Sequence, residues 1–136
     1  MEERIKELTA EMVKNVGASS GSLNELGKKL GLNLPADYID FMTETNGATG
    51  FVGPNSFLQV WSVEEVVELN NSVEDISEEH GEWLFFGGMG GGSWYAFDTR
   101  YEPMPVVEVD MNDPDYNYVR GASFAEFLEN LYTAEE

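Results

Sequence analysis

The stretch "WLFFGGMGGGSWYAFD", residues 83–98, holds five of the chain's 14 glycines within six positions, between two runs rich in aromatic side chains. A glycine cluster of this kind either cradles a phosphate ahead of a helix or forms a tight turn between two strands. The flanks favour the second interpretation, because short runs of aromatic and β-branched residues are typical of strands.

Neither phosphate-binding fingerprint fits the cluster. The dinucleotide pattern G-x-G-x-x-G, tried in both possible frames, meets Ser93 or Tyr95 where its last glycine belongs. The P-loop pattern finds Gly87 and Gly92 at the right spacing, but Ser93 occupies its lysine position. Both patterns also need a helix next, whereas "SWYAFD" alternates like a strand. The stretch therefore predicts a glycine-rich hairpin.

Two further segments extend this cluster of strands. "GFVGPNSFLQVW", residues 50–61, carries the turn residues Gly-Pro-Asn between short apolar runs, and "PVVEVD", residues 105–110, is rich in valine. They predict a hairpin before the glycine stretch and one more strand after it.

The N-terminal third predicts helices. Apolar residues at helical spacing cover residues 5–16, and Gly17 is a plausible end. A second helix is expected to begin at the capping pair Ser22 and Glu25 and to end at Gly31.

The third helix is expected within "LPADYIDFMTETNG", residues 34–47, with Pro35 in its first turn and Asn-Gly as its stop signal. Two later helices begin at capping boxes, in which a serine accepts from a free amide and a glutamate three residues later reaches back. These pairs are Ser62 with Glu65 and Ser123 with Glu126. The order of elements predicts one α+β domain over residues 1–136, with a mostly antiparallel central sheet against which N-terminal helices and a C-terminal helix pack.

Charge is unevenly distributed along the chain, whose net charge is −19. Residues 1–30 carry five basic and five acidic side chains, whereas residues 31–136 carry 21 acids against only Arg100 and Arg120. Such a surface repels nucleic acid and anionic membranes and attracts basic partners. The alternative is that the acids serve solubility or adaptation to a salty cytosol.

Several function classes are disfavoured by composition. The chain has no cysteine, which excludes disulfides and thiolate chemistry and suits a reducing cytoplasm. Its N-terminus lacks the uncharged core of a signal peptide, and no apolar run approaches the roughly 20 residues that cross a bilayer. We therefore expect a soluble cytoplasmic protein that binds neither membrane nor nucleic acid.

Catalytic and metal-binding motifs also fail. There is no G-x-S-x-G, and the single histidine, His80, fits a helix end better than a general base. "DMNDPDYNYVRG", residues 110–121, starts like a calcium loop but carries Pro114, Asp115 and Gly121 at positions that the loop does not allow. We expect no catalytic residue, no cofactor and no metal.

Two acidic segments remain as candidate surfaces. Residues 64–82 hold no lysine or arginine, and the acids of residues 108–115 are followed by Tyr116 and Tyr118. Tyrosine supplies contact area at low entropic cost while carboxylates steer a basic partner, although a solvated helix face and an ordinary turn would look the same. The predicted partner-binding residues are Glu64, Glu65, Glu68, Asp75, Asp113, Asp115 and Tyr116.

Three motifs follow one another after residue 20: a helix between "LP" and "NG" (residues 34–47), a strand–glycine–strand segment that ends in aspartate (residues 85–98), and "SFAEFL" (residues 123–128). This order resembles the SUKH superfamily of Smi/Knr-like proteins. The matching positions look like capping, turn and core positions, so the resemblance implies no catalytic set. They are Pro35, Asn46, Gly47, Asp98, Ser123 and Phe124.

The resemblance implies an α+β fold. Because many bacterial members are immunity proteins, it also implies that the chain neutralises a polymorphic toxin whose gene lies beside its own. Joined with the acidic surface, it predicts a non-enzymatic protein that binds a basic cognate toxin, namely a nuclease domain, as a monomer or weak homodimer. The alternative is a regulatory or scaffold domain with a non-toxin partner. A small enzyme or cation-binding domain is the third hypothesis.

Overall fold

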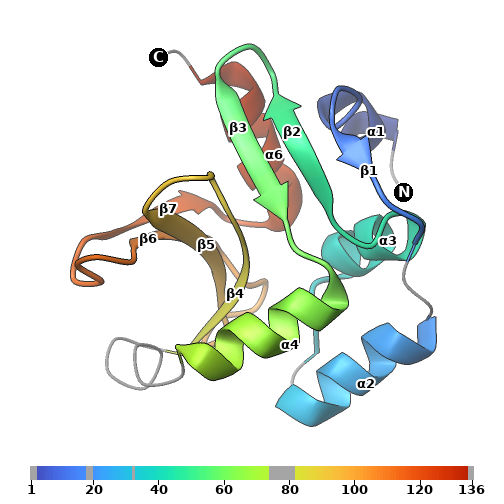
Figure 1. Cartoon of the computed structure of the whole chain (residues 1–136), viewed down its shortest axis with the longest axis vertical. Coiled ribbons are helices and arrows are strands. Elements are labelled where there is room, and N and C mark those ends of the chain that lie inside the picture. The colour runs from blue at the N-terminus through green and yellow to red at the C-terminus, as the bar shows by residue number, and fades with distance from the viewer. Residues whose placement is uncertain (1–2, 18–19, 32, 74–81, 135–136) are drawn as a thin grey trace.

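The computed structural model describes residues 3–17, 20–31, 33–73 and 82–134. Within these residues, seven strands form one antiparallel sheet whose spatial order equals their order in the chain (Figure 1). The strands are β1 (Val13–Lys14), β2 (Ala48–Val52), β3 (Ser56–Val60), β4 (Trp83–Gly88), β5 (Ser93–Asp98), β6 (Val106–Asp110) and β7 (Asn117–Gly121). The predicted α+β fold with an antiparallel sheet is confirmed.

Helices precede the sheet, interrupt it and close the chain. They are α1 (Glu3–Leu8), α2 (Ser20–Leu30), α3 (Ala36–Glu44), α4 (Val63–Ser72) and α6 (Phe124–Thr133). In Figure 1, α6 lies behind the β2–β3 hairpin, and α2 and α4 lie at the opposite end of the molecule. Helix α6 contacts α1 and α3, while α2 contacts α4.

The glycine stretch forms the predicted hairpin between β4 and β5. Trp83 pairs with Asp98 at one end of this hairpin and Gly88 pairs with Trp94 at the other. The connection passes through Gly90, whose φ of 83° lies in the left-handed region that favours glycine. No helix follows the turn, so the arrangement that a phosphate fingerprint needs is absent here.

Strand β4 is buried along its whole length. Phe86 contacts Phe124 and Phe127 of α6, and the ring of Phe97 stacks on it with centroids 4.4 Å apart. The preceding residue, Phe85, lies on the other face and contacts Trp94. Because both faces are covered, β4 reads as a continuous apolar run and not as an alternation.

Two predicted helix starts need correction. Helix α2 begins at Ser20, so Ser22 lies in its first turn and is not the N-cap that the Ser22–Glu25 pair predicted. Pro35 is the N-cap of α3 and therefore precedes the helix, whose first turn it was expected to join.

The capping boxes fare better. Ser62 and Glu65 form the complete box at the start of α4. Ser123 accepts from the amide of Glu126 as predicted, but the glutamate side chain accepts from Ala122 instead of from Ser123.

The first predicted helix is too long, because α1 ends at Leu8 and does not reach Val16. The Thr9 hydroxyl donates to the Ile5 carbonyl at 2.8 Å, and the chain then extends into β1, which pairs with β2. The Val16 carbonyl accepts from the Asn46 amide at 3.0 Å, so this segment is held in extended form by the end of α3. The apolar spacing of residues 5–16 was misleading because Val16 is exposed.

The sheet parts between β3 and β4. These strands pair only at Gln59 with Gly88 and at Val60 with Gly87, so the β2–β3 hairpin diverges from the rest of the sheet (Figure 1). Beyond this point Asn70 of α4 takes the place of a neighbouring strand. Its side-chain amide donates to the Phe85 carbonyl at 2.7 Å, and its oxygen accepts from the Phe85 amide at 2.8 Å.

Candidate partner-binding surface

The predicted acids of α4 lie on an exposed helix face, but two of them serve the helix itself. Glu65 accepts from the Ser62 amide at 3.0 Å as part of the capping box. Glu64 accepts from the side-chain amide of Asn46 at 3.2 Å and 3.3 Å. Glu68 makes no hydrogen bond or ion pair with the described residues. Of the three, Glu68 is therefore the carboxylate most available to a partner.

Asn46 has a role that its sequence signal did not reveal. The Asn-Gly pair was predicted only to end α3, and Gly47 does adopt a φ of 88° there. In addition, the side-chain oxygen of Asn46 accepts from the Val63 amide at 2.8 Å, which caps the first turn of α4. One residue thus links the end of α3 to the start of the acidic helix.

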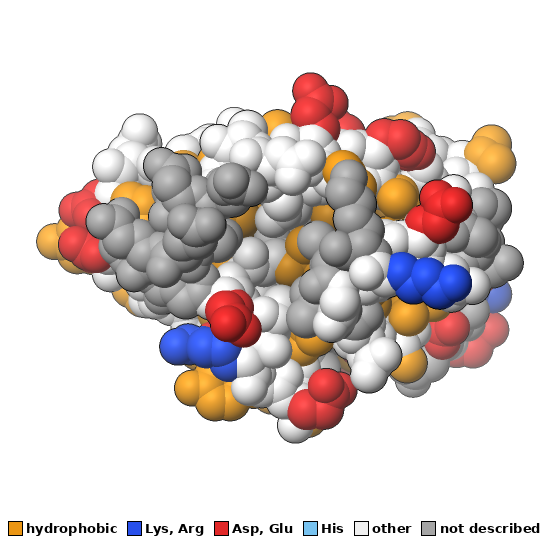
Figure 2. Space-filling view, turned by 90° about the horizontal axis from the view of Figure 1, so that it is seen from below, with side chains coloured by type: hydrophobic (Ala, Val, Ile, Leu, Met, Phe, Trp, Pro, Cys, Tyr) orange, Lys and Arg blue, Asp and Glu red, His pale blue; other side chains and the backbone are white. Residues whose placement is uncertain are grey.

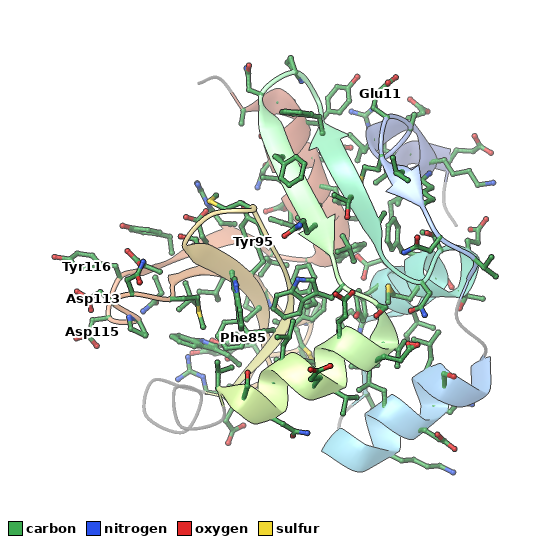
Figure 3. All side chains as sticks on the ribbon, in the orientation of Figure 1. Glu11, Phe85, Tyr95, Asp113, Asp115 and Tyr116 are labelled. Carbon is green, nitrogen blue, oxygen red and sulfur yellow. The ribbon has the colours of Figure 1, made fainter. Side chains whose placement is uncertain are left out.

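The predicted partner-binding residues of the β6–β7 turn lie close together in the structure. Asp113, Asp115 and Tyr116 project together from the turn between β6 and β7, at one extremity of the molecule (Figure 3). The carboxylate of Asp110 shapes this turn by accepting from the amides of Asn112 and Asp113 at 2.9 Å and 3.3 Å.

The two clusters lie apart and do not form one patch. Helix α4 runs along the lower part of the molecule in Figure 1. Figure 3 has the same orientation and shows Asp113 and Asp115 at the far left. Seen from below, the acidic side chains are spread over the face (Figure 2). Two sequence-predicted positions, Asp75 as a partner-binding residue and His80 as a helix-end residue, lie outside the described residues.

A groove that no sequence signal indicated lies between the β2–β3 hairpin, the C-terminal end of β7 and α6. It has a volume of about 760 Å³ and occupies the space that opens where the β2–β3 hairpin leaves the sheet. Side chains from β3, the β4–β5 turn, β5, β7 and α6 line it. Among them are Phe57, Met89, Tyr95, Val119, Arg120 and Glu126.

Tyr95 lies in the groove and is almost fully buried. Burial, assisted by the nearby Glu108 carboxylate, raises the pKa of Tyr95 to about 12, although Arg120 opposes this shift. Glu108 pairs with Tyr95 across β5 and β6, and its carboxylate accepts from Nε of Arg120 at 3.0 Å. At neutral pH the protonated Tyr95 hydroxyl is a hydrogen-bond donor at the groove.

The aspartate that ends the strand–glycine–strand motif is a structural residue. Asp98 is buried, and its two carboxylate oxygens accept from Nε and Nη2 of Arg100 at 2.9 Å and 2.7 Å. These hydrogen bonds hold the pKa of Asp98 below its usual range. Among the described residues, no group of three or more His, Asp or Glu side chains could hold a metal ion.

Comparison with known proteins agrees with the arrangement of motifs. The SMI1 / KNR4 family (SUKH-1) matches residues 17–130, a range that includes all three motifs and both of the described acidic clusters. No curated protein matches the chain. In the part of the chain that the structure describes, no helix has the length and apolar character needed to span a membrane.

Proposed function

The chain belongs to the SMI1 / KNR4 family (SUKH-1), and on that basis we propose that it is an immunity protein that binds and neutralises a cognate toxin encoded beside it. Many bacterial members of the wider superfamily act in this way. The family match spans residues 17–130, so the proposal rests on most of the fold and not on an isolated motif.

The observation that carries the choice of partner is the charge of residues 31–136. Their only basic side chains, Arg100 and Arg120, are both bound internally, to Asp98 and to Glu108. The 21 acidic side chains of residues 31–136 far outnumber these two cations, and Glu129 is paired with Arg4 of α1. A strongly negative surface accelerates encounter with a positive partner and disfavours nucleic acid.

A nuclease domain is the toxin class that this surface fits best. A nuclease holds phosphates in a basic groove, and an acidic protein can occupy that groove in place of the nucleic acid. Neutralisation by occupation needs no chemistry from the immunity protein. We propose a non-enzymatic cytoplasmic role for the chain.

Binding to the product of the adjacent toxin gene tests the proposal. We expect a stable complex at low ionic strength, with an association rate that falls as salt is added, because steering between opposite charges is screened. If the purified toxin domain does not bind at low ionic strength, the proposal fails. Absence of any toxin gene beside this one would favour the alternative, a regulatory or scaffold protein with a different partner.

Charge-reversal variants test whether the predicted acidic residues contribute to toxin binding. Asp113→Lys and Glu68→Lys should slow association with the toxin while leaving the melting temperature unchanged, because both side chains are exposed. Glu11→Lys is the matched control, since Glu11 is exposed on the opposite side of the molecule from Asp113 (Figure 3) and the change in net charge is the same. Equal slowing by Asp113→Lys and Glu11→Lys would mean that only net charge matters and would remove Asp113 from the interface.

A further inference from the structure

We propose that the free edge of β7, together with the groove beside it, binds an extended basic segment of the partner. This inference rests on the proposed function and assigns a surface and a mode of binding to it. The segment would pair with β7 as an additional strand and place an apolar side chain in the groove.

Strand β7 offers a free edge at residues 117–119, because the Arg120 carbonyl that follows accepts from the Asn130 side chain of α6 at 2.9 Å. It is the last strand in the order of the sheet, and residues 117–120 are exposed. In an antiparallel ladder every second residue of an outer strand directs its N–H and C=O away from its only neighbour. The other outer strand, β1, spans only two residues. Of the two described edges, β7 is therefore the one that can take up another strand.

The groove opens beside this edge and has apolar walls. Val119 of β7 is 67% exposed and is one of the residues that line the groove. Phe57 and Met89 contribute apolar surface from β3 and from the β4–β5 turn. Exposed apolar side chains around a concave site are typical of recognition surfaces.

The glycine-rich turn at the groove allows close approach. Gly90 takes a left-handed φ against the ring of Phe57, and a Cβ added to Gly91 would meet no atom within 4 Å. The backbone at Gly91 is consequently uncovered, between Gly90 against Phe57 and Gly92 against Asn112, so a partner's main chain can come near it there.

Carboxylates stand at both ends of the edge, which defines the chemistry of the segment. Asp113 lies in the turn that leads into β7, and Glu126 lines the groove after the strand has ended. The intervening Arg120 is bound to Glu108. A segment with an apolar centre and lysine or arginine on both sides complements this arrangement. A second copy of the chain is a poor occupant, because two molecules of net charge −19 repel each other.

A pair of matched substitutions tests the assignment against the toxin domain. Val119→Lys puts a positive charge on the β7 edge, where it repels a basic segment. Val13→Lys makes the same change on the exposed edge of β1, where Val13 is 75% exposed. We expect Val119→Lys to weaken toxin binding at least about tenfold and Val13→Lys to weaken it less than about twofold. Melting temperatures check that both variants fold.

A probe that does not depend on the toxin keeps the inference separate from the proposed function. The capped peptide Lys-Val-Lys-Leu-Lys-Val-Lys, titrated into the labelled protein, should shift the backbone amide resonances of residues 117–121. The same peptide with glutamate in place of lysine should not. Ala122→Trp fills the groove from a position outside the strand, so it should weaken binding of the basic peptide and binding of the toxin alike. This variant replaces Val119→Lys in the test if Val119→Lys does not fold.

The outcomes separate the two claims. Toxin binding that Val119→Lys and Ala122→Trp leave unchanged overturns the β7 assignment while the immunity function stands. Peptide shifts on β7 in a protein that fails to bind the toxin support the edge as a basic-segment site and overturn the proposed function. Shifts at β1 instead of β7, or self-association that Val119→Lys abolishes, overturn the inference.

Discussion

At the scale of single residues, the glycines of the central motif are not equivalent. Gly87 lies in β4 where a Cβ would collide with the Gln59 carbonyl of β3, whereas Gly90 is needed for its backbone conformation. Gly91 has open space around it and no positive φ. Of these three glycines, one is therefore fixed by packing and one by the turn, and one has no local structural requirement.

This difference predicts the outcome of two alanine substitutions. Gly87→Ala should lower the free energy of unfolding by about 2 kcal/mol or more, because the backbone of β3 must move to admit the methyl group. Gly91→Ala should change it by less than about 0.5 kcal/mol. Urea denaturation of both variants measures this, and equal effects would show that the contact between β3 and β4 is not as close as described.

Asp98 predicts a pH dependence of stability. Its hydrogen bonds with Arg100 lower its pKa in the folded protein, so the folded state holds the charged form more tightly than the unfolded state does. The resulting stabilisation is present above the ordinary aspartate pKa of about 3.9 and is lost as the pH falls through the lower pKa of the folded protein.

The test compares wild type with Asp98→Asn across this range. At neutral pH the variant should be less stable, and the difference in unfolding free energy should shrink as the pH falls below about 4. A difference that stays constant to low pH would mean that the ion pair with Arg100 contributes nothing to folding.

At the scale of elements, the side chain of Asn70 replaces a missing strand. Phe85 is fully buried, and both of its backbone groups bond to the Asn70 amide. Asn70→Ala should therefore cost about 2–3 kcal/mol, because it leaves a buried N–H and a buried C=O unpaired.

The neighbouring residue supplies the control for this prediction. The Asn71 side chain is exposed and makes no hydrogen bond with the described residues, so Asn71→Ala should change stability by less than about 0.5 kcal/mol. Thermal denaturation compares the two variants, and amide hydrogen exchange at Phe85 should accelerate only in Asn70→Ala. Unchanged protection of the Phe85 amide in Asn70→Ala would contradict the claim that the Asn70 side chain takes the place of a neighbouring strand.

The elements that could be predicted are those with local signals. The Ser62 capping box, the glycine-rich hairpin and the valine-rich β6 depend on residues close together in the sequence, and all were correct. Strands β1 and β7 were not predicted, because their sequences lack an alternating buried face and they form only by pairing with a neighbour. The role of Asp37 was not predicted either, because its carboxylate accepts from the Ala125 amide at the start of α6, which is far away in the sequence.

The candidate site could be predicted only in part. The exposed acids of α4 and of the β6–β7 turn were visible as runs of charge. The groove could not be predicted, because it forms where β3 and β4 stop pairing and is lined by residues from five separate segments. Glu65 was predicted both as the reciprocal member of the capping box and as a partner-contacting residue. The structure confirms the first role, and the second stays a prediction.

At the scale of the whole molecule, the net charge of −19 acts on the fold and on binding in opposite ways. Repulsion among carboxylates destabilises the compact state, so added sodium chloride should raise the melting temperature. The same salt should slow association with a basic toxin. Differential scanning calorimetry over a range of salt measures the first effect, and a melting temperature that falls with salt would show that attractive ion pairs outweigh the repulsion.

The most direct test of the central claim is a titration of the purified toxin domain's activity with this protein at low ionic strength. Occupation of the toxin's nucleic-acid groove predicts that activity falls linearly to zero at one molecule of protein per molecule of toxin, and that Val119→Lys needs a larger excess whereas Val13→Lys does not. Full toxin activity in the presence of excess wild-type protein would contradict the account.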